Sequence, residues 1–361
     1  MRIHLLSEAD SYLQEIMNNI DFSSLDSFLN DHMRSKLTFQ ELVGKVITEG
    51  WDALNAENIC TFVFDSVFYE ISVARPIFLK MLCFSLLFSL IHRLLVTKNK
   101  YISDIGFLTI YATLMVLLMQ SFFMVRDIAM EGINTLITFL NALIPTYAVT
   151  LVFSGNSVSG AVLYEVAFVM VYLLELAMKL LLSPLVHVFV LVLFLNHLFD
   201  EDKLTKLAMF VEKGILLFLK GSFGLVIGLG VVQSMLTPAK DRLMGNTVLF
   251  GLSSIPGIGN AIGSAGEILL SCGMLVKNSV GVIGLLVLSL LAVIPVLKIG
   301  CFGVMYYILS IFLQPIADKR ITECVSGIAR GCNLYLKMVM YTMLLFFVLF
   351  SIVSTATSFA F

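Results

Sequence analysis

The sequence predicts an all-α fold, a polytopic bundle of membrane-crossing helices, and two observations carry this prediction. Of the 361 residues, 59% are apolar and 13% are charged, whereas a soluble domain has about 25% charged residues. The mean hydropathy is +0.97, so the chain has too few polar side chains to cover a water-facing surface. A helix needs about 20 apolar residues to cross a bilayer. Windows near that length contain no Asp, Glu, Lys or Arg: 105–125, 132–164, 180–199, 221–239, 243–266, 278–297, 299–317 and 338–361.

The first part of the chain is acidic and differs from the rest. Residues 1–75 contain 5 Lys and Arg against 12 Asp and Glu, whereas the remainder contains 18 against 13. Apolar residues recur there at helical spacing, which predicts amphipathic helices. The first twenty residues do not resemble a secretory signal, because acidic residues interrupt a short apolar run, so the route of export stays open. We therefore divide the chain into an acidic helical region, 1–75, and a multi-pass transmembrane domain, 76–361.

The predicted crossings number about seven or eight. They cover residues 77–96, 105–125, a segment ending near Phe153, 160–182, 184–199, 214–235, 279–313 and 338–358. The loop between the first two carries Lys98 and Lys100, and short positive loops stay in the cytoplasm. This orientation places the acidic region on the other side of the membrane.

Turn residues and mixed charge set several of these boundaries. The cluster SGNSVSG at 154–160 and the pair Ser183-Pro184 predict helix ends. The segment 200–213 has a mixed-charge amphipathic pattern, which predicts a helix lying along the cytoplasmic surface.

The segment 279–313 is interrupted by Pro295 and Lys298. It is either one long kinked helix or two short ones. The positive residues that follow it favour a single helix, because one crossing leaves them in the cytoplasm.

The glycine-rich segment 251–278 separates two apolar stretches. It lacks the glycine spacing of a dinucleotide fold, and no GK[ST] follows, so nucleotide binding is not expected. Two interpretations stay open: a discontinuous or re-entrant element beside a solute pathway, or an amphipathic hairpin at the surface. The residues assigned to the first interpretation are Pro256, Gly257, Gly259, Gly263, Glu267, Lys277 and Asn278.

Charges within the apolar segments are the other candidate sites. Glu175 and Lys179 stand four residues apart on one predicted helical face and can form an ion pair. Such groups often mark a pathway, although a lysine near a helix end can also extend to the membrane surface. His187 and His197 do not share a helical face, and no metal-ligand spacing or protease motif occurs, so we expect no catalytic residue, metal or cofactor.

Pairs of glycines four residues apart predict close helix packing. They include Gly224 with Gly228 and Gly327 with Gly331. Small residues at this spacing allow helix backbones to approach each other, within one bundle or between subunits.

Four stretches resemble the stage III sporulation protein AE family of endospore-forming bacteria. They are LNALIPTYAVTLVFSG (140–155), GLSSIPGIGNAIGSAGEILLSCGMLVKNSVGVIGL (251–285), PVLKIGCFGVMYYILSIFLQPIADKRITEC (295–324) and the apolar tail. The resemblance implies a polytopic protein of the mother-cell membrane that surrounds the forespore. It also implies membership of the complex encoded by the IIIA operon. That complex meets the forespore protein IIQ across the intermembrane space and acts as a channel or feeding apparatus.

The resulting prediction is a non-enzymatic component of this sporulation channel, or secretion-like complex. No nucleic-acid partner is expected, and self-association stays open. The alternative is a stand-alone secondary transporter for small solutes that uses Glu175, Lys179 and the glycine-rich segment. Transporters often contain internal repeats, and the second half of the chain does not repeat the first.

Overall fold

The computed structural model describes residues 2–33, 38–49, 78–87, 100–154, 169–198, 203–228 and 259–356, with a few single positions between them. At several helix ends, and over 259–269, it describes the backbone only. The regular structure within these ranges is entirely helical, as predicted.

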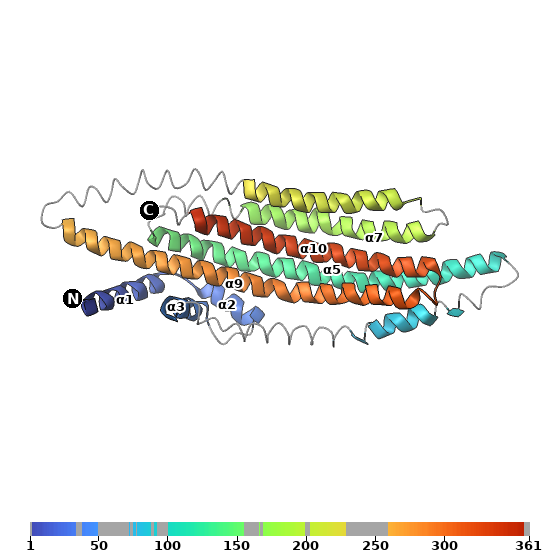
Figure 1. Ribbon diagram of the computed structural model, residues 1–361, viewed down its shortest axis with the longest axis horizontal. Helices are drawn as coiled ribbons and strands as arrows, with labels where there is room; N and C mark the ends of the chain where they lie inside the picture. Colours follow the sequence, from blue (N-terminus) through green and yellow to red (C-terminus); the bar gives the residue numbers. More distant parts are fainter. Residues whose placement is uncertain are drawn as a thin grey trace.

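Long helices lie side by side and form an elongated bundle (Figure 1). The helices are α1 (Arg2–Asn19), α2 (Ser23–Met33), α3 (Phe39–Glu49), α5 (Lys100–Phe153), the π-helix η2 (Ala177–Leu182), α7 (Ser183–Leu198), an unlabelled helix over 205–228, α9 (Gly259–Leu313) and α10 (Lys319–Ala356). α5 contains 54 residues and α9 contains 55. At 1.5 Å per residue each is about 80 Å long, well over twice the roughly 30 Å of hydrocarbon in a bilayer.

Four helices of the described part are long and apolar enough to cross a membrane. They are Ile105–Phe153, Val169–Asn196, Leu270–Leu313 and Lys319–Ser351. A shorter apolar helix, Phe78–Leu87, falls within the first predicted crossing. The larger count of seven or eight is therefore seen only in part among the described residues.

The crossings predicted over 105–125 and toward Phe153 form one uninterrupted helix, α5. The charged segment RDIAME at 126–131 separated them in the sequence. Charge lowers hydropathy but does not break a helix, and Arg, Ala, Met and Glu all favour one. The prediction of a boundary there is wrong.

The helix end predicted at Ser183-Pro184 is also wrong. η2 runs directly into α7, so the helix is continuous across this pair. Proline lacks the amide hydrogen of an α-helical turn and its ring crowds the preceding turn. A π-turn widens the helix just before Pro184, and the Ser183 amide donates to the carbonyl of Met178. Pro184 is therefore accommodated by a local bulge in the helix and does not end it.

The other helices also extend farther than the predicted boundaries. The surface segment was predicted over 200–213, and its described part, from residue 203, leads directly into the helix over 205–228. α9 passes through Pro295 as a single helix, which agrees with the charge argument. The last helix begins at Lys319, well before the predicted 338.

α5 and α9 pack antiparallel along most of their length. Their contacts pair Ser121 with Tyr306, and then Gly132 with Pro295, Leu143 with Gly284 and Phe153 with Gly273. The partners on α9 step back eleven residues at a time, and those on α5 advance by the same amount or one less. Eleven residues make very nearly three helical turns, so two almost straight helices can stay in contact without winding around each other.

The acidic region supplies three short helices that pack on this pair. α1 and α3 contact α9, and α2 contacts α5. α3 begins with a capping box, in which Glu41 N donates to Thr38 Oγ1 and Thr38 N donates to Glu41 Oε2, each at 3.1 Å. Before α2, the hydroxyl and amide of Ser23 donate to Asp21, which lowers the pKa of that carboxyl group.

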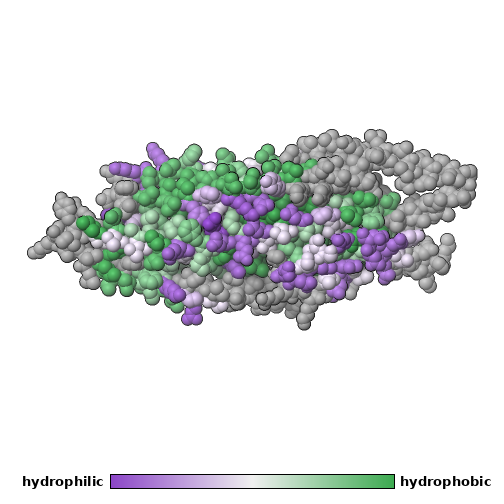
Figure 2. Space-filling model, turned by 180° about the vertical axis from the view of Figure 1, so that it is seen from behind, coloured by the Kyte–Doolittle hydropathy of each residue, from purple (hydrophilic) through white to green (hydrophobic). Residues whose placement is uncertain are grey.

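One face of the bundle has an uneven distribution of polarity. Figure 2 shows hydrophilic side chains gathered along the middle of this face and toward the end that carries α1. Hydrophobic side chains cover most of the described surface toward the opposite end, and large apolar side chains such as Ile105, Val304 and Phe312 are exposed on the bundle. Large exposed apolar side chains of this kind are expected where lipid surrounds a protein.

The close contact at Gly273 gives a test of the packing. A Cβ atom there would overlap the backbone carbonyl of Phe153, so we expect Gly273→Ala to destabilise the bundle by about 1–3 kcal/mol. Gly224 and Gly228 meet nothing within 4 Å, so the close packing predicted for this pair is not found within the described bundle, and Gly224→Ala should leave stability unchanged or raise it. Thermal unfolding in detergent, followed by circular dichroism, measures both. Equal melting temperatures would contradict the α5–α9 packing.

Candidate functional site

The residues predicted to line a pathway fall into three groups. Pro256 and Gly257 lie outside the described residues. Gly259, Gly263 and Glu267 belong to the first turns of α9, where only the backbone is described, and that backbone is helical. Lys277 and Asn278 lie farther along α9, the first buried and the second exposed.

Lys277 is 1% exposed and is among the largest fully buried side chains of the described part. Three buried hydroxyl residues, Thr146, Thr150 and Ser154, follow each other at four-residue spacing, the first two on α5 and the third directly after its end. The register of α5 against α9 brings Lys277 to the level of Thr150. We call these four residues the buried polar strip. It places a cationic group in the interior of a mostly apolar bundle, where polar groups are costly and commonly functional.

The hydroxyl groups of the strip are satisfied mainly by their own helix. Thr150 Oγ1 donates to Tyr147 O at 2.6 Å, and Ser154 Oγ donates to Leu151 O at 2.9 Å. Thr146 Oγ1 donates to Ala142 O at 3.1 Å and lies 3.4 Å from Asp21 O. Such local bonds let hydroxyl residues sit in an apolar helix, and their oxygen atoms can still accept further bonds.

A second polar cluster lies just after the π-turn and consists of Ser183, His187 and Tyr335. The Tyr335 hydroxyl is 3.0 Å from His187 Nδ1 and 3.3 Å from both oxygen atoms of Ser183. His187 Nδ1 is 2.9 Å from Ser183 O. Phe122 and Phe123 pack on the imidazole ring. Tyr335 was not predicted as a site residue, because it lies 148 residues from His187 along the chain.

The predicted partners Glu175 and Lys179 lie 2.5 Å apart, at Glu175 Oε1 and Lys179 Nζ. Their side chains are 31% and 40% exposed. Both precede His187 on the same continuous helix, whereas Lys277 lies near the Phe153 end of α5. The structure therefore places the ion pair and the buried polar strip on different helices and at different levels of the bundle.

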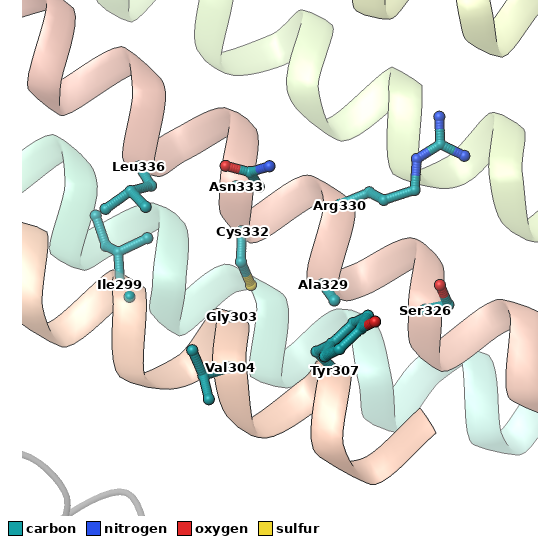
Figure 3. Close-up of a pocket in the computed structure, with 11 residues that line it drawn as sticks. Ile299, Gly303, Val304, Tyr307, Ser326, Ala329, Arg330, Cys332, Asn333 and Leu336 are labelled. Carbon is teal, nitrogen blue, oxygen red and sulfur yellow. The ribbon is translucent and has the colours of Figure 1, made fainter. Parts of the chain in front are cut away.

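Cavities lie on two sides of α9, against α10 and against α5. The larger, about 420 Å³, separates α9 from α10, and its lining includes Gly303, Tyr307, Ser326 and Asn333 (Figure 3). The smaller, about 180 Å³, separates α9 from α5. It is lined by Ile128, Glu131, Gly132, Thr135, Leu291, Ile294, Pro295 and Lys298. Over the described ranges no group of three His, Cys, Asp or Glu side chains could hold a metal ion.

The His187 cluster supports a prediction about stability. Tyr335→Phe removes the hydroxyl that contacts both His187 and Ser183, and we expect a loss of about 1 kcal/mol. Tyr307 is 63% exposed, so Tyr307→Phe should change stability by less than about 0.5 kcal/mol. Thermal midpoints in detergent compare the two. Indistinguishable midpoints would mean that the cluster contributes nothing.

Comparison with known proteins connects this architecture to sporulation. The family model described as stage III sporulation protein AE matches residues 37–357. The stage III sporulation protein AE of Bacillus subtilis (strain 168) is 24% identical over 297 residues, which cover 81% of this chain and 74% of that protein. No solved structure matches. The family match includes the four candidate membrane spans and the buried polar strip, and the chain belongs to the stage III sporulation protein AE family.

Proposed function

We propose that this protein is a non-enzymatic, integral membrane component of a channel, or secretion-like complex, between mother cell and forespore. It acts in the mother-cell membrane that surrounds the forespore and is needed for late forespore development. The observation that carries the proposal is the buried polar strip inside a bundle with four candidate membrane spans. Membership of a sporulation family supplies the biological setting.

The burial of Lys277 supports a conduit rather than a bundle with only a structural role. A fully buried lysine in a membrane helix costs several kcal/mol unless polar groups surround it. The row of buried hydroxyl groups lies at the same level of the bundle. A bundle with only a packing role could place an apolar residue at 277 without this cost.

The proposed partners are the other membrane proteins encoded by the IIIA operon and, across the intermembrane space, the forespore protein IIQ. The acidic helices α1 to α3 would meet them on the outer side of the membrane. Their exposed faces carry acidic side chains such as Glu15, Asp31 and Glu41. The predicted seven or eight crossings and the re-entrant segment before α9 belong to the same proposal.

A second candidate function is that of a stand-alone transporter. The smaller cavity favours it, because Glu131 and Lys298 line one cleft between two apolar helices. Opposite charges in a half-open cleft could bind a zwitterionic solute. Solute flux separates the two functions.

We expect purified protein in liposomes to give no saturable flux of small solutes, and we expect the protein from sporulating cells to co-purify with its partners. A component of a complex is incomplete alone, whereas a transporter carries its whole binding site. Radiolabelled uptake and affinity purification measure the two outcomes. Saturable flux by the isolated protein would replace the first function by the second.

Lys277→Met tests the buried polar strip. Methionine fills nearly the same volume without charge, so we expect normal accumulation and partner binding. Spore yield should fall by about tenfold, the effect of raising a barrier by roughly 1.4 kcal/mol. Lys319→Met, at the exposed start of α10, is the matched control and should sporulate normally. Normal spore yield with Lys277→Met would remove the strip from the function.

A further inference from the structure

A row of lysines runs along the helix over 205–228. Lys206, Lys213 and Lys220 are seven residues apart, and all three are exposed. Seven residues make about two helical turns, so the three side chains leave the helix in nearly the same direction at intervals of about 10 Å. The opposite face of this helix carries Ala208, Val211, Ile215 and Leu219 and is buried.

A similar row occupies the first half of α10. Arg330 and Lys337 are seven residues apart, and the exposed Asn333 lies between them. Arg330 and Asn333 both belong to the lining of the larger cavity, and Figure 3 shows the guanidinium group of Arg330 extending from α10 toward a neighbouring helix. Beyond Lys337 the exposed residues of α10 become apolar, with Met340, Leu344 and Phe347.

The two helices lie side by side and run in the same direction. Arg330 Nη2 is 2.6 Å from Glu212 Oε2. The rings of Phe223 and Tyr341 are 6.4 Å apart. In both pairs the two partners are 118 residues apart in the sequence. The helix over 205–228 and α10 therefore keep the same register from one contact to the next. We call the surface formed by the two rows the cationic seam: Lys206, Lys213, Lys220, Arg330, Asn333 and Lys337.

Positive charge dominates among the ionisable groups of this surface, and Phe210 and Leu217, 75% and 73% exposed, stand between the lysines. Five cationic side chains face two carboxylates, Glu212 and Glu323, on the same two helices. Glu212 already pairs with Arg330. The seam extends over about 21 Å, most of the thickness of a hydrocarbon layer.

The neighbouring surface is apolar. Leu191 and Leu195 of α7 and Leu225 of the helix over 205–228 are exposed, and α7 and α10 belong to candidate membrane spans. A cationic side chain facing hydrocarbon near the middle of a span costs about 2.5–3.5 kcal/mol. Lysines at the ends of the row can extend to the surface, but Lys213 in the middle cannot do so as easily. At the depth of the hydrocarbon, where the membership of α10 in a candidate span puts it, the seam needs water on its outer side.

We propose that the cationic seam lines an aqueous lumen in the assembled complex and that this lumen favours small anionic solutes. The inference rests on the proposed channel function and adds the class of solute. Rings or rows of Lys and Arg select anions in pores, because a positive low-dielectric channel raises the local anion concentration. The larger cavity beside Asn333 gives a solute room next to the seam.

The test measures thiol labelling in broken membranes from sporulating cells, which expose both sides of the bilayer. Asn333→Cys places a thiol on the seam. Leu225→Cys is the control, since Leu225 is 68% exposed and lies about 140° around the helix from Lys220. Two membrane-impermeant methanethiosulfonates, one anionic and one cationic, are the probes. Fragment-resolved mass spectrometry locates the label, because Cys332 is adjacent and buried.

At position 333 we expect the anionic probe to react about fivefold faster than the cationic one. The ratio should fall toward one when Lys213→Gln and Lys337→Gln are added. The control position should react with neither probe. Three results would overturn the inference: no labelling at position 333, a ratio that favours the cationic probe, or labelling of both positions, which would place this whole face in water.

Co-purification with the partner proteins is measured on the same membranes. If the partners are absent while position 333 still shows anion-selective labelling, the proposed complex fails and the aqueous seam stands. If the partners are present and position 333 is inert, the complex stands and the lumen assignment fails.

Discussion

The close antiparallel contact of α5 with α9 is the constraint on which the rest of the structure depends. Glycine at 132, 273 and 284 lets the two helices approach until side chains or backbone of one fill the space that a Cβ would occupy on the other. The contacts recur at intervals of about three turns, so two helices about 80 Å long remain nearly straight neighbours. This register also determines which residues of α5 lie beside each polar residue of α9. This brings Lys277 to the hydroxyl row and Pro295 to the space left by Gly132.

The same register explains why charge does not interrupt the helices. Arg126, Asp127 and Glu131 fall in the middle of α5, and Lys298 of α9 lines a cleft with Glu131. Arg126 and Asp127 are exposed, so a bilayer centred on this level would have to hold charged side chains in contact with lipid. The apolar lengths on either side, 105–125 and 132–153, are each close to the thickness of a bilayer. These charged residues therefore lie at one level of the bundle, and the helical backbone of α5 continues through that level.

Predictions from the sequence were most accurate for features that depend on the residues of one helix. The all-helical fold and the amphipathic helices of the acidic region follow from local composition, and the continuity of α9 through Pro295 agrees with the distribution of positive charge after it. They were weakest at boundaries, because the charged segment after Val125 and the proline at 184 were both interpreted as helix ends. A π-turn accommodates Pro184, and only the three-dimensional packing gives a reason for the wider turn. The four-residue spacing of Thr146, Thr150 and Ser154 was visible in the sequence. The contact of His187 with Tyr335 was not, since no local pattern links residues so far apart.

Hydropathy alone also underestimates the helix over 205–228. Its charged side chains keep it out of the candidate membrane spans of the described part, yet one face is as apolar as those of its neighbours and packs beside α10. An average over all sides of a helix cannot separate a helix that lies on a membrane from one that lines a polar path within it, because both have one apolar face and one charged face. The ion pair of Glu212 with Arg330 favours the second description. Together with the contact of Phe223 with Tyr341, it holds this helix lengthwise against α10, which is long and apolar enough to cross a membrane.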